Sequence, residues 1–200
     1  MTIFSRLILV LAVSTAALAA APAAAARGFG GVVSHVTDGD TLRVRPDGGG
    51  PPRAVRLQGI DAPEICQAHG VQAREALAAR VLHQRVTVDT RAIDSWRRTL
   101  AVVSLEQPVQ RGPDRRNPAA AEPDLGAWMV GQGHAWSPRF RGRLGPYAPQ
   151  EAQARGARLG LWAGGTPVEP RVFRKEQGSC YRDRRITQPV SLAPACAPVA

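Results

Sequence analysis

Four carboxylates in two short turns are the residues whose types and spacing could do chemistry in this chain. The first turn is Asp38-Gly39-Asp40-Thr41 and the second is Asp61-Ala62-Pro63-Glu64. Arg56 lies between the two turns in the sequence. Apolar residues flank both turns, so the carboxylates would converge in one cleft if the flanking segments pair as strands. Such a cleft would attract a cation.

The residues between the two turns are typical of a β-hairpin. Apolar and polar residues alternate over 41–45 and again over 55–57, and the stretch 47–52 between them is rich in glycine and proline. Antiparallel pairing would place Asp40, which precedes the outgoing strand, beside Asp61, which follows the returning one. Because calcium takes about six to eight oxygen ligands, the two aspartates, a backbone carbonyl of the second turn and water would suit it.

Five segments of the chain, in the same order, resemble signature segments of the staphylococcal nuclease (thermonuclease) family. They are Asp38 to Thr41, Arg56 to Glu64, Asp94 to Ala101, Met129 to Ala135, and Glu151 to Trp162. The resemblance extends over residues 31–162. It implies a nuclease that acts on DNA and RNA and uses calcium.

The resemblance assigns a catalytic role to three of the matched residues, and the chemistry of phosphodiester hydrolysis agrees with it. The water that attacks phosphorus must lose a proton, and negative charge accumulates on the phosphoryl oxygens. Glu64 would be the general base. Arg56 and Arg98 would stabilise the accumulating charge through bidentate hydrogen bonds.

Four further residues are assigned to the metal. Asp40, Asp61 and the backbone carbonyl of Ala62 would hold the calcium ion. Ala62 stands where the family frequently has threonine, which matters little if only the backbone carbonyl reaches the metal. Asp38 precedes a glycine and is expected to be a turn residue, with a place behind the metal ligands as the alternative.

We therefore expect an exported, calcium-dependent endonuclease. By resemblance, it would hydrolyse DNA, RNA or both with little sequence specificity and leave 3′-phosphate ends. The alternative is a catalytically inactive barrel that binds nucleic acid or another polyanion of the cell envelope. Each residue also has a plainer explanation, because Asp40 could merely bond its own turn and Arg56 could merely neutralise Asp61. The presence of the whole set favours the nuclease.

The elements that must position these residues are predicted from periodicity. Strands are expected over residues 31–37, 41–45, 55–57, 86–90 and 100–105, and helices over 70–85, 125–130 and 151–158. Asp124 could cap the second helix. These elements predict a mainly β fold with helices (α+β), in which a five-stranded barrel of the oligonucleotide-binding type carries about three helices.

The domain organisation follows from composition. Residues 1–26 have the single charge, apolar run and Ala-x-Ala sites of a signal peptide, with a membrane anchor as the alternative. The barrel domain is expected over 27–168, interrupted by a flexible arginine-rich loop at 107–123. This loop is expected to be solvated, and the alternatives are that it gathers phosphates or captures an envelope partner. A basic, then proline- and alanine-rich tail follows over 169–200. We expect a periplasmic or secreted monomer with no stable membrane span after cleavage.

The charge and the cysteines leave alternatives open. A formal net charge of +10 favours a polyanionic partner such as nucleic acid, although solubility or an arginine-rich codon bias would also explain it.

The chain has three cysteines, Cys66, Cys180 and Cys196, which is an odd number for a protein of an oxidising compartment. A bond within the tail between Cys180 and Cys196 would close a short loop worth about 3 kcal/mol and is slightly favoured, with Cys66–Cys180 as the rival.

The aromatic residues and histidines receive plainer interpretations. Trp128 and Trp162 are expected to pack in the core. The family's base-stacking residues lie in the segment that holds Trp136, Phe140 and Tyr147, but arginines occupy the matching positions here, and Phe140 is the remaining candidate. The four histidines, His35, His69, His83 and His134, share no ligand spacing and are expected to be surface or packing residues.

Overall fold

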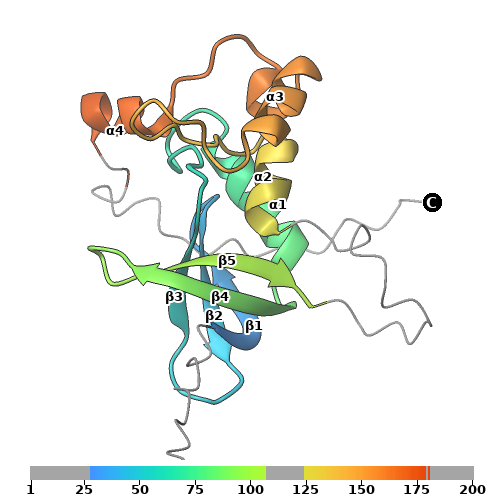
Figure 1. Ribbon diagram of the computed structural model, residues 1–200, viewed down its shortest axis with the longest axis vertical. Helices are drawn as coiled ribbons and strands as arrows, with labels where there is room; N and C mark the ends of the chain where they lie inside the picture. Colours follow the sequence, from blue (N-terminus) through green and yellow to red (C-terminus); the bar gives the residue numbers. More distant parts are fainter. Residues whose placement is uncertain (1–27, 107–123, 179, 181–200) are drawn as a thin grey trace, which may run out of the picture.

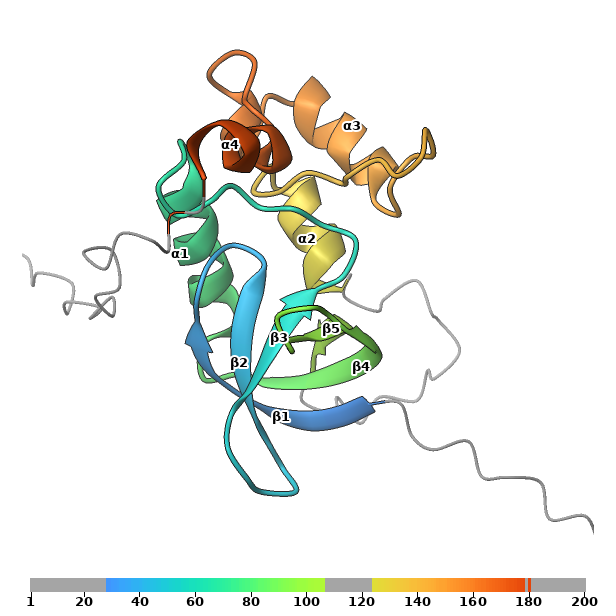
Figure 2. The same cartoon turned by 90° about the vertical axis from the view of Figure 1, so that its left-hand side faces the viewer.

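The computed structural model describes residues 28–106, 124–178 and 180, and its centre is a closed five-stranded barrel (Figures 1 and 2). The strands are β1 (Gly28–Val36), β2 (Thr41–Pro46), β3 (Arg53–Leu57), β4 (Arg85–Ile93) and β5 (Thr99–Leu105). Their order around the barrel is β1-β2-β3-β5-β4, with β1 also paired to β4. All pairs are antiparallel except β3 with β5, which are parallel. The predicted fold class is confirmed.

The alternation of apolar and polar residues sets the inside of the barrel. In β2, Leu42 and Val44 are fully buried while Arg43 and Arg45 are exposed, because successive side chains of a strand point to opposite faces. The other strands contribute Val33, Val55, Leu57, Val86, Val88, Ala101 and Val103 to the same core. Helix residues Ala73, Leu77, Val81, Leu125 and Met129 close it.

The first helix, α1 (Gly70–Val81), is shorter than the periodicity predicts. The helix was expected to continue to residue 85, but Leu82 is already extended and His83 has a φ of 65°. The N–H of His83 donates to the carbonyl of Val33 in β1 at 2.9 Å. The helix therefore ends early because its next residues pair with the barrel instead.

The remaining helices lie with α1 at one end of the molecule (Figure 1). They are α2 (Leu125–Gly131), α3 (Ala148–Gly156), the short 3-10 helix η2 (Gly160–Trp162) and α4 (Pro170–Gln177). The side chain of Asp124 accepts a hydrogen bond from the N–H of Ala127 at 2.9 Å, which confirms the predicted cap. The sequence predicts about three helices, and α4 is the additional one. It begins just after the predicted domain boundary at residue 168.

A disulfide bond joins the residue Cys180 after α4 to the loop between β3 and α1. Cys180, three residues after the end of α4, bonds to Cys66, which follows the second acidic turn, with a Cα–Cα distance of 5.7 Å. The interpretation that favoured a bond between Cys180 and Cys196 is therefore wrong. Figure 2 shows α4 beside the loop after β3, and this docking brings Cys180 to Cys66. Cys196 lies outside the described residues.

Several predicted segments also lie outside the described residues. These are the signal peptide at 1–26, the arginine-rich loop at 107–123 and the tail beyond Cys180. Within residues 28–106, 124–178 and 180, no helix is both long enough and apolar enough to cross a membrane.

Candidate active site

Arg56 joins the two acidic turns. Its Nη1 donates to Oδ1 of Asp40 at 2.8 Å, and its Nη2 donates to Oδ1 of Asp61 at 3.0 Å. Burial lowers the pKa of Arg56, but the charges of the two aspartates outweigh burial and raise that pKa above its usual value. One guanidinium thus holds both carboxylates at the open end of the β2–β3 hairpin, as the sequence predicts.

The strand register places these side chains. Arg56 lies opposite Thr41, the residue after Asp40, in the antiparallel ladder of β2 and β3. On the other side, the backbone of Asp61 forms an antiparallel bridge with Trp136 through two hydrogen bonds of 3.0 Å. Asp61 is therefore fixed between the barrel and the segment that follows α2.

Asp40 is the most deeply buried acid of the cluster, with only 4% of its surface exposed. Its Oδ1 also accepts from the Thr41 hydroxyl at 2.9 Å, and its Oδ2 accepts from the N–H of Ala62 at 3.2 Å. Burial raises the pKa of Asp40 from 3.8 to about 6. The charge of Asp38 adds to this rise, and the contacts with Arg56 and Ala62 offset it only in part. A further cation would offset the cost of ionising Asp40.

Asp38 stabilises the first acidic turn. Its Oδ1 accepts from the N–H of Asp40 at 3.0 Å, which is the contact of a turn in which an aspartate side chain bonds the backbone two residues on. The turn role expected of Asp38 is thus met. Its role behind a metal ion, and that of the Ala62 carbonyl as a ligand, stay predictions.

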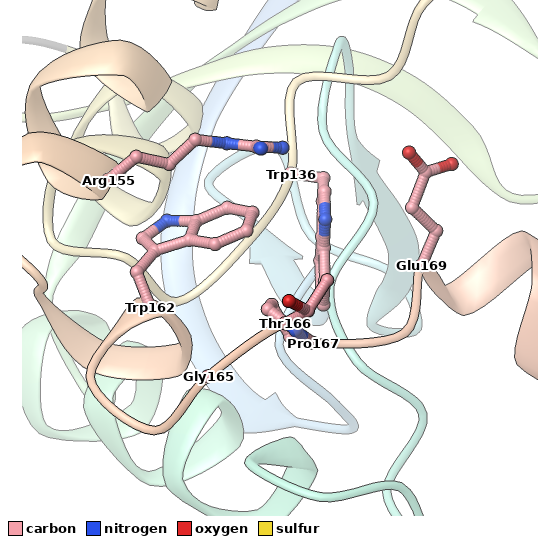
Figure 3. A pocket seen from close by; sticks show the side chains of 7 residues that line it. All are labelled: Trp136, Arg155, Trp162, Gly165, Thr166, Pro167 and Glu169. Carbon is pink, nitrogen blue, oxygen red and sulfur yellow. The ribbon is translucent and has the colours of Figure 1, made fainter.

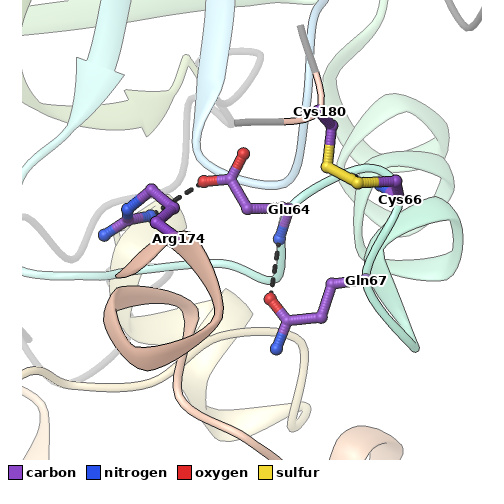
Figure 4. Close-up of a disulfide and its surroundings, with 5 residues drawn as sticks. All are labelled: Glu64, Cys66, Gln67, Arg174 and Cys180. Carbon is purple, nitrogen blue, oxygen red and sulfur yellow. Dashed lines mark hydrogen bonds and ion pairs between the residues drawn. A yellow bond between two sulfur atoms is a disulfide. The ribbon is translucent and has the colours of Figure 1, made fainter. Parts of the chain in front are cut away.

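Glu64 lies in the second turn with only 13% of its side chain exposed. Its backbone N–H donates to Oε1 of Gln67 at 3.1 Å, and its Oε1 accepts from Nη1 of Arg174 at 2.8 Å (Figure 4). Arg174 also donates to both oxygens of Asp61, at 3.2 and 2.9 Å. Arg174 therefore links Glu64 to Asp61 as Arg56 links Asp61 to Asp40.

Arg98 reaches the same cluster through a hydroxyl. Its Nη1 donates to the Thr41 Oγ1 at 3.3 Å, and that hydroxyl donates to Asp40. Asp94 holds Arg98 in place, because its carboxylate accepts from the Nε of Arg98 at 2.7 Å and from the N–H of Arg98 at 2.8 Å. Burial raises the pKa of Asp94, but these hydrogen bonds and the charge of Arg98 outweigh burial and lower it. The predicted catalytic and metal-binding side chains thus form one continuous network.

Two residues of the network were missed by the sequence analysis. Asp94 is named in the sequence only as the first residue of a segment that resembles the family, although its four-residue spacing from Arg98 is a signal for a local ion pair. Arg174 lies in the segment that the sequence predicts to be a basic tail. Pro170 at the start of the segment and Gly178 after it mark a short helix, but nothing local indicates that Arg174 points into an acidic cluster.

The oxygen donors of Asp40, Asp61 and Glu64 fit a hard cation such as calcium in their chemistry. Guanidinium groups from Arg56 and Arg174 contact all three carboxylates. Among the described residues, no group of three or more His, Cys, Asp and Glu side chains is arranged to hold a metal ion. The donor set therefore suits such a cation in its chemistry, and Arg174 contacts two of the three carboxylates.

The aromatic residues near the site divide into packing and exposed groups. Trp136 and Trp162 are only 4% and 8% exposed and pack edge to face, with ring centroids 5.4 Å apart. The packing role expected of Trp162 is confirmed. Tyr147 donates its hydroxyl to Asp124 at 2.9 Å. Phe140 is 70% exposed beneath the guanidinium of Arg141, so it stays the candidate for contact with a base.

A pocket of about 340 Å³ is lined in part by Trp136, whose backbone pairs with Asp61. Figure 3 shows its lining, which consists of Trp136, Arg155, Trp162, Gly165, Thr166, Pro167 and Glu169. The guanidinium carbon of Arg155 lies 4.0 Å from the ring centroid of Trp162 and covers its face. The buried rings therefore offer little free surface for stacking.

Comparison with known proteins agrees with the family resemblance seen in the sequence. A family model described as staphylococcal nuclease homologue matches residues 54–164. This interval contains Arg56, Asp61, Glu64 and Arg98. Arg174 lies beyond it.

Three relatives cover most of the chain. The chain is 42% identical over 154 residues to Protein ParB of Escherichia coli, which covers 74% of this chain and 81% of that protein. It is 36% identical over 151 residues to a Micrococcal nuclease of Shigella flexneri, with the same two coverages. It is 33% identical over 147 residues to an Uncharacterized endonuclease of Haemophilus influenzae, which covers 72% of each chain.

Proposed function

This chain belongs to the staphylococcal nuclease family, and from that premise we propose that it is an exported, calcium-dependent endonuclease. Family membership supports an enzyme that hydrolyses nucleic acid. The substrate would be DNA, RNA or both, cut with little sequence specificity to leave 3′-phosphate ends. The observation that carries the proposal is the continuous network that gathers Asp40, Arg56, Asp61, Glu64 and Arg98 at one end of the barrel.

Glu64 is the proposed general base. Hydrolysis requires that the attacking water lose a proton, and a carboxylate within reach of that water accepts it. The Gln67 side chain holds the Glu64 backbone, so the position of the carboxylate is fixed by the loop and not only by its own rotamer. Glu64 Oε1 contacts Arg174, and its other oxygen is the one we assign to the water.

Arg56 and Arg98 stabilise the charge that develops on the phosphoryl oxygens. A guanidinium presents a planar set of donors that matches two phosphate oxygens. Arg56 is already held by two aspartates and Arg98 by Asp94. Groups that are positioned before the reaction need no reorganisation when the charge appears, which is the main source of electrostatic catalysis.

Asp40, Asp61 and the carbonyl of Ala62 are the proposed calcium ligands, with Asp38 behind them. A bound divalent ion supplies Lewis-acid stabilisation of a phosphoryl oxygen. The burial of Asp40 favours such an ion, since a positive charge lowers the cost of keeping the carboxylate ionised.

Export is a separate part of the proposal. Residues 1–26 have the composition of a signal peptide. The Cys66–Cys180 disulfide supports an oxidising location such as the periplasm or the exterior. We propose a monomer that retains no membrane span after cleavage.

Cleavage of a quenched fluorescent oligonucleotide tests the proposal. The purified protein should cut it with calcium but not with a chelator, and Glu64→Ala should lose about a hundredfold or more in rate, roughly the contribution of a general base. Glu75→Ala is the matched control, because Glu75 is an exposed acid on α1 and its loss should leave the rate unchanged. If the folded wild type binds the oligonucleotide without cutting it, the chain is instead an inactive polyanion-binding barrel.

A further inference from the structure

Arg174 occupies the part of the acidic cluster where a metal ion would be held. It donates to both oxygens of Asp61, which is a proposed calcium ligand, and to Oε1 of Glu64, which is the proposed base. With Arg56, it brings two guanidinium charges to the three carboxylates of Asp40, Asp61 and Glu64. Without Arg174, the net charge of the cluster would be more negative by one unit, and the carboxylates would attract a divalent cation more strongly.

Two bonds tie the ends of the α4 segment to the loop that carries Glu64. Before α4, the carbonyl of Val168 accepts from the Nε2 of Gln67 at 2.6 Å. After α4, Cys180 is bonded to Cys66, whose N–H also donates to the Cys180 sulfur at 3.1 Å. Figure 4 shows Gln67, Cys66 and Cys180 around Glu64, with Arg174 reaching Glu64 from the helix. The helix therefore lies across the acidic loop like a strap that is fastened at both ends.

The middle of this strap packs weakly. Pro170 is the one buried residue of α4, Phe173 is half-buried, and Val172 is 42% exposed. The Arg174 side chain itself is 36% exposed. An element with few buried apolar contacts opens at a small free-energy cost. The ion pairs of Arg174 and the two end bonds are therefore important contacts that keep α4 over the cluster.

We propose that α4 is an autoinhibitory strap whose Arg174 competes with the divalent ion for Asp61 and Glu64, and that the Cys66–Cys180 bond keeps it in place. The inference rests on the proposed function in that it takes these carboxylates as the metal-binding and catalytic ones. The disulfide acts through effective concentration, because it holds α4 near the carboxylates, so that the guanidinium of Arg174 rebinds to them more often than it would on an untethered segment. Calcium binding must displace Arg174, so the strap sets the calcium concentration at which the site fills.

Calcium affinity, measured by titration calorimetry without nucleic acid, tests the competition directly. Arg174→Ala should bind calcium about tenfold more tightly than the wild type, because a neighbouring positive charge and a bidentate competitor are both removed. Arg171→Ala is the matched control, since it removes the same charge from an exposed position of the same helix and should change the affinity less than about twofold. An unchanged or weaker affinity for Arg174→Ala overturns the proposal, as does an equal gain in both variants.

The role of the Cys66–Cys180 bond is tested by combining two changes. The double variant Cys66→Ser/Cys180→Ser should bind calcium several-fold more tightly than the wild type, by analogy with a lost tether. The same double change made in Arg174→Ala should have no further effect. If the loss of the disulfide shifts the calcium affinity equally in both backgrounds, the disulfide does not act through Arg174, and its proposed role is rejected. Circular dichroism of each variant serves as the control that the variants compared are folded.

The failure of this inference is distinguishable from the failure of the proposed function. Calorimetry reports on the strap, whereas oligonucleotide cleavage and Glu64→Ala report on the nuclease. If Arg174 were instead a positioning residue for Glu64, Arg174→Ala would cut more slowly at saturating calcium with an unchanged calcium affinity. That result overturns the strap and leaves the nuclease standing.

Discussion

Arg56 bridges Asp40 and Asp61, donating one nitrogen to each carboxylate at 2.8 and 3.0 Å. This bridge joins the two acidic turns that start and finish the β2–β3 hairpin. Its three members are all largely buried, with 21% of the Arg56 side chain and 10% or less of the two aspartate side chains exposed. The bridge therefore contributes to the fold as well as to the proposed chemistry.

Arg56→Ala should destabilise the protein and also remove activity. The change leaves two buried carboxylates without their shared partner, and breaking a buried ion pair in this way costs about 3 kcal/mol or more. Urea unfolding measures this loss. Added calcium should restore part of the stability, because an ion at the same carboxylates replaces the missing charge.

Arg53→Ala is the control for that experiment, because Arg53 is an exposed arginine on the same strand that contacts the ring of Phe29. It should cost about 1 kcal/mol or less. An equal loss from both changes would show that the bridge has no special importance for stability.

Asp94→Asn should reduce catalysis without unfolding the protein. Asp94 holds Arg98 by two hydrogen bonds, so its neutral replacement leaves that guanidinium less well positioned. Since small displacements of a catalytic group are costly, kcat should fall about tenfold while KM changes little. Steady-state kinetics measure both. Asp89→Asn, which breaks an exposed pair with Arg91, should leave both unchanged.

Gly70→Ala should displace the loop that carries Glu64. Gly70 begins α1, and a Cβ there would overlap the carbonyl oxygen of Glu64 and approach the Cα of Ile65. Overpacking of this kind costs about 1–3 kcal/mol, and the shifted base should reduce kcat about tenfold or more. Thermal unfolding and kinetics measure the two effects.

Gly156→Ala is the matched change at the end of α3, where a Cβ would meet no atom within 4 Å. It should be neutral or slightly stabilising, because alanine favours the helical conformation. A functional Gly70→Ala protein with wild-type stability would contradict the predicted collision.

The pair His69 and His134 should make stability depend on pH. Nε2 of His69 lies 3.1 Å from Nδ1 of His134, and the rings stack. Burial lowers the pKa of both, and with the charge of His69 it lowers that of His134 from 6.5 to about 4. The folded protein thus takes up this proton less readily than the unfolded chain, so stability is lost as the pH falls from 6.5 toward 4.

Urea unfolding across this pH range, on the wild type and on His134→Gln, isolates the contribution. The wild type should lose about 1 kcal/mol more than the variant, a value reduced for solvent screening of a partly exposed group. Asp40 acts in the opposite direction, since its pKa is raised to about 6 and its protonation on acidification favours the folded state. His35→Gln, at an exposed position, should follow the wild type. Parallel profiles for His134→Gln and the wild type would exclude a role for the pair.

The sequence by itself determined the barrel and the core of the candidate site. The alternation around Leu42 and Val44 is enough to define a hairpin, and a hairpin brings Asp40 and Asp61 together because its register is fixed by the buried face. The capping of α2 by Asp124 is equally local. Such features depend on neighbours in the sequence or across one strand pair.

Only the tertiary structure decided which distant segments meet. The periodicity of α1 predicts a helix to residue 85, but pairing with β1 ends it at Val81. Loop-closure entropy favours a bond between Cys180 and Cys196, the nearest pair in the sequence. The docking of α4 instead places Cys180 beside Cys66, and these two form the bond. The same docking brings Arg174 to Asp61 and Glu64 across more than a hundred residues of sequence. No local pattern encodes such a contact, because it depends on where a whole helix packs.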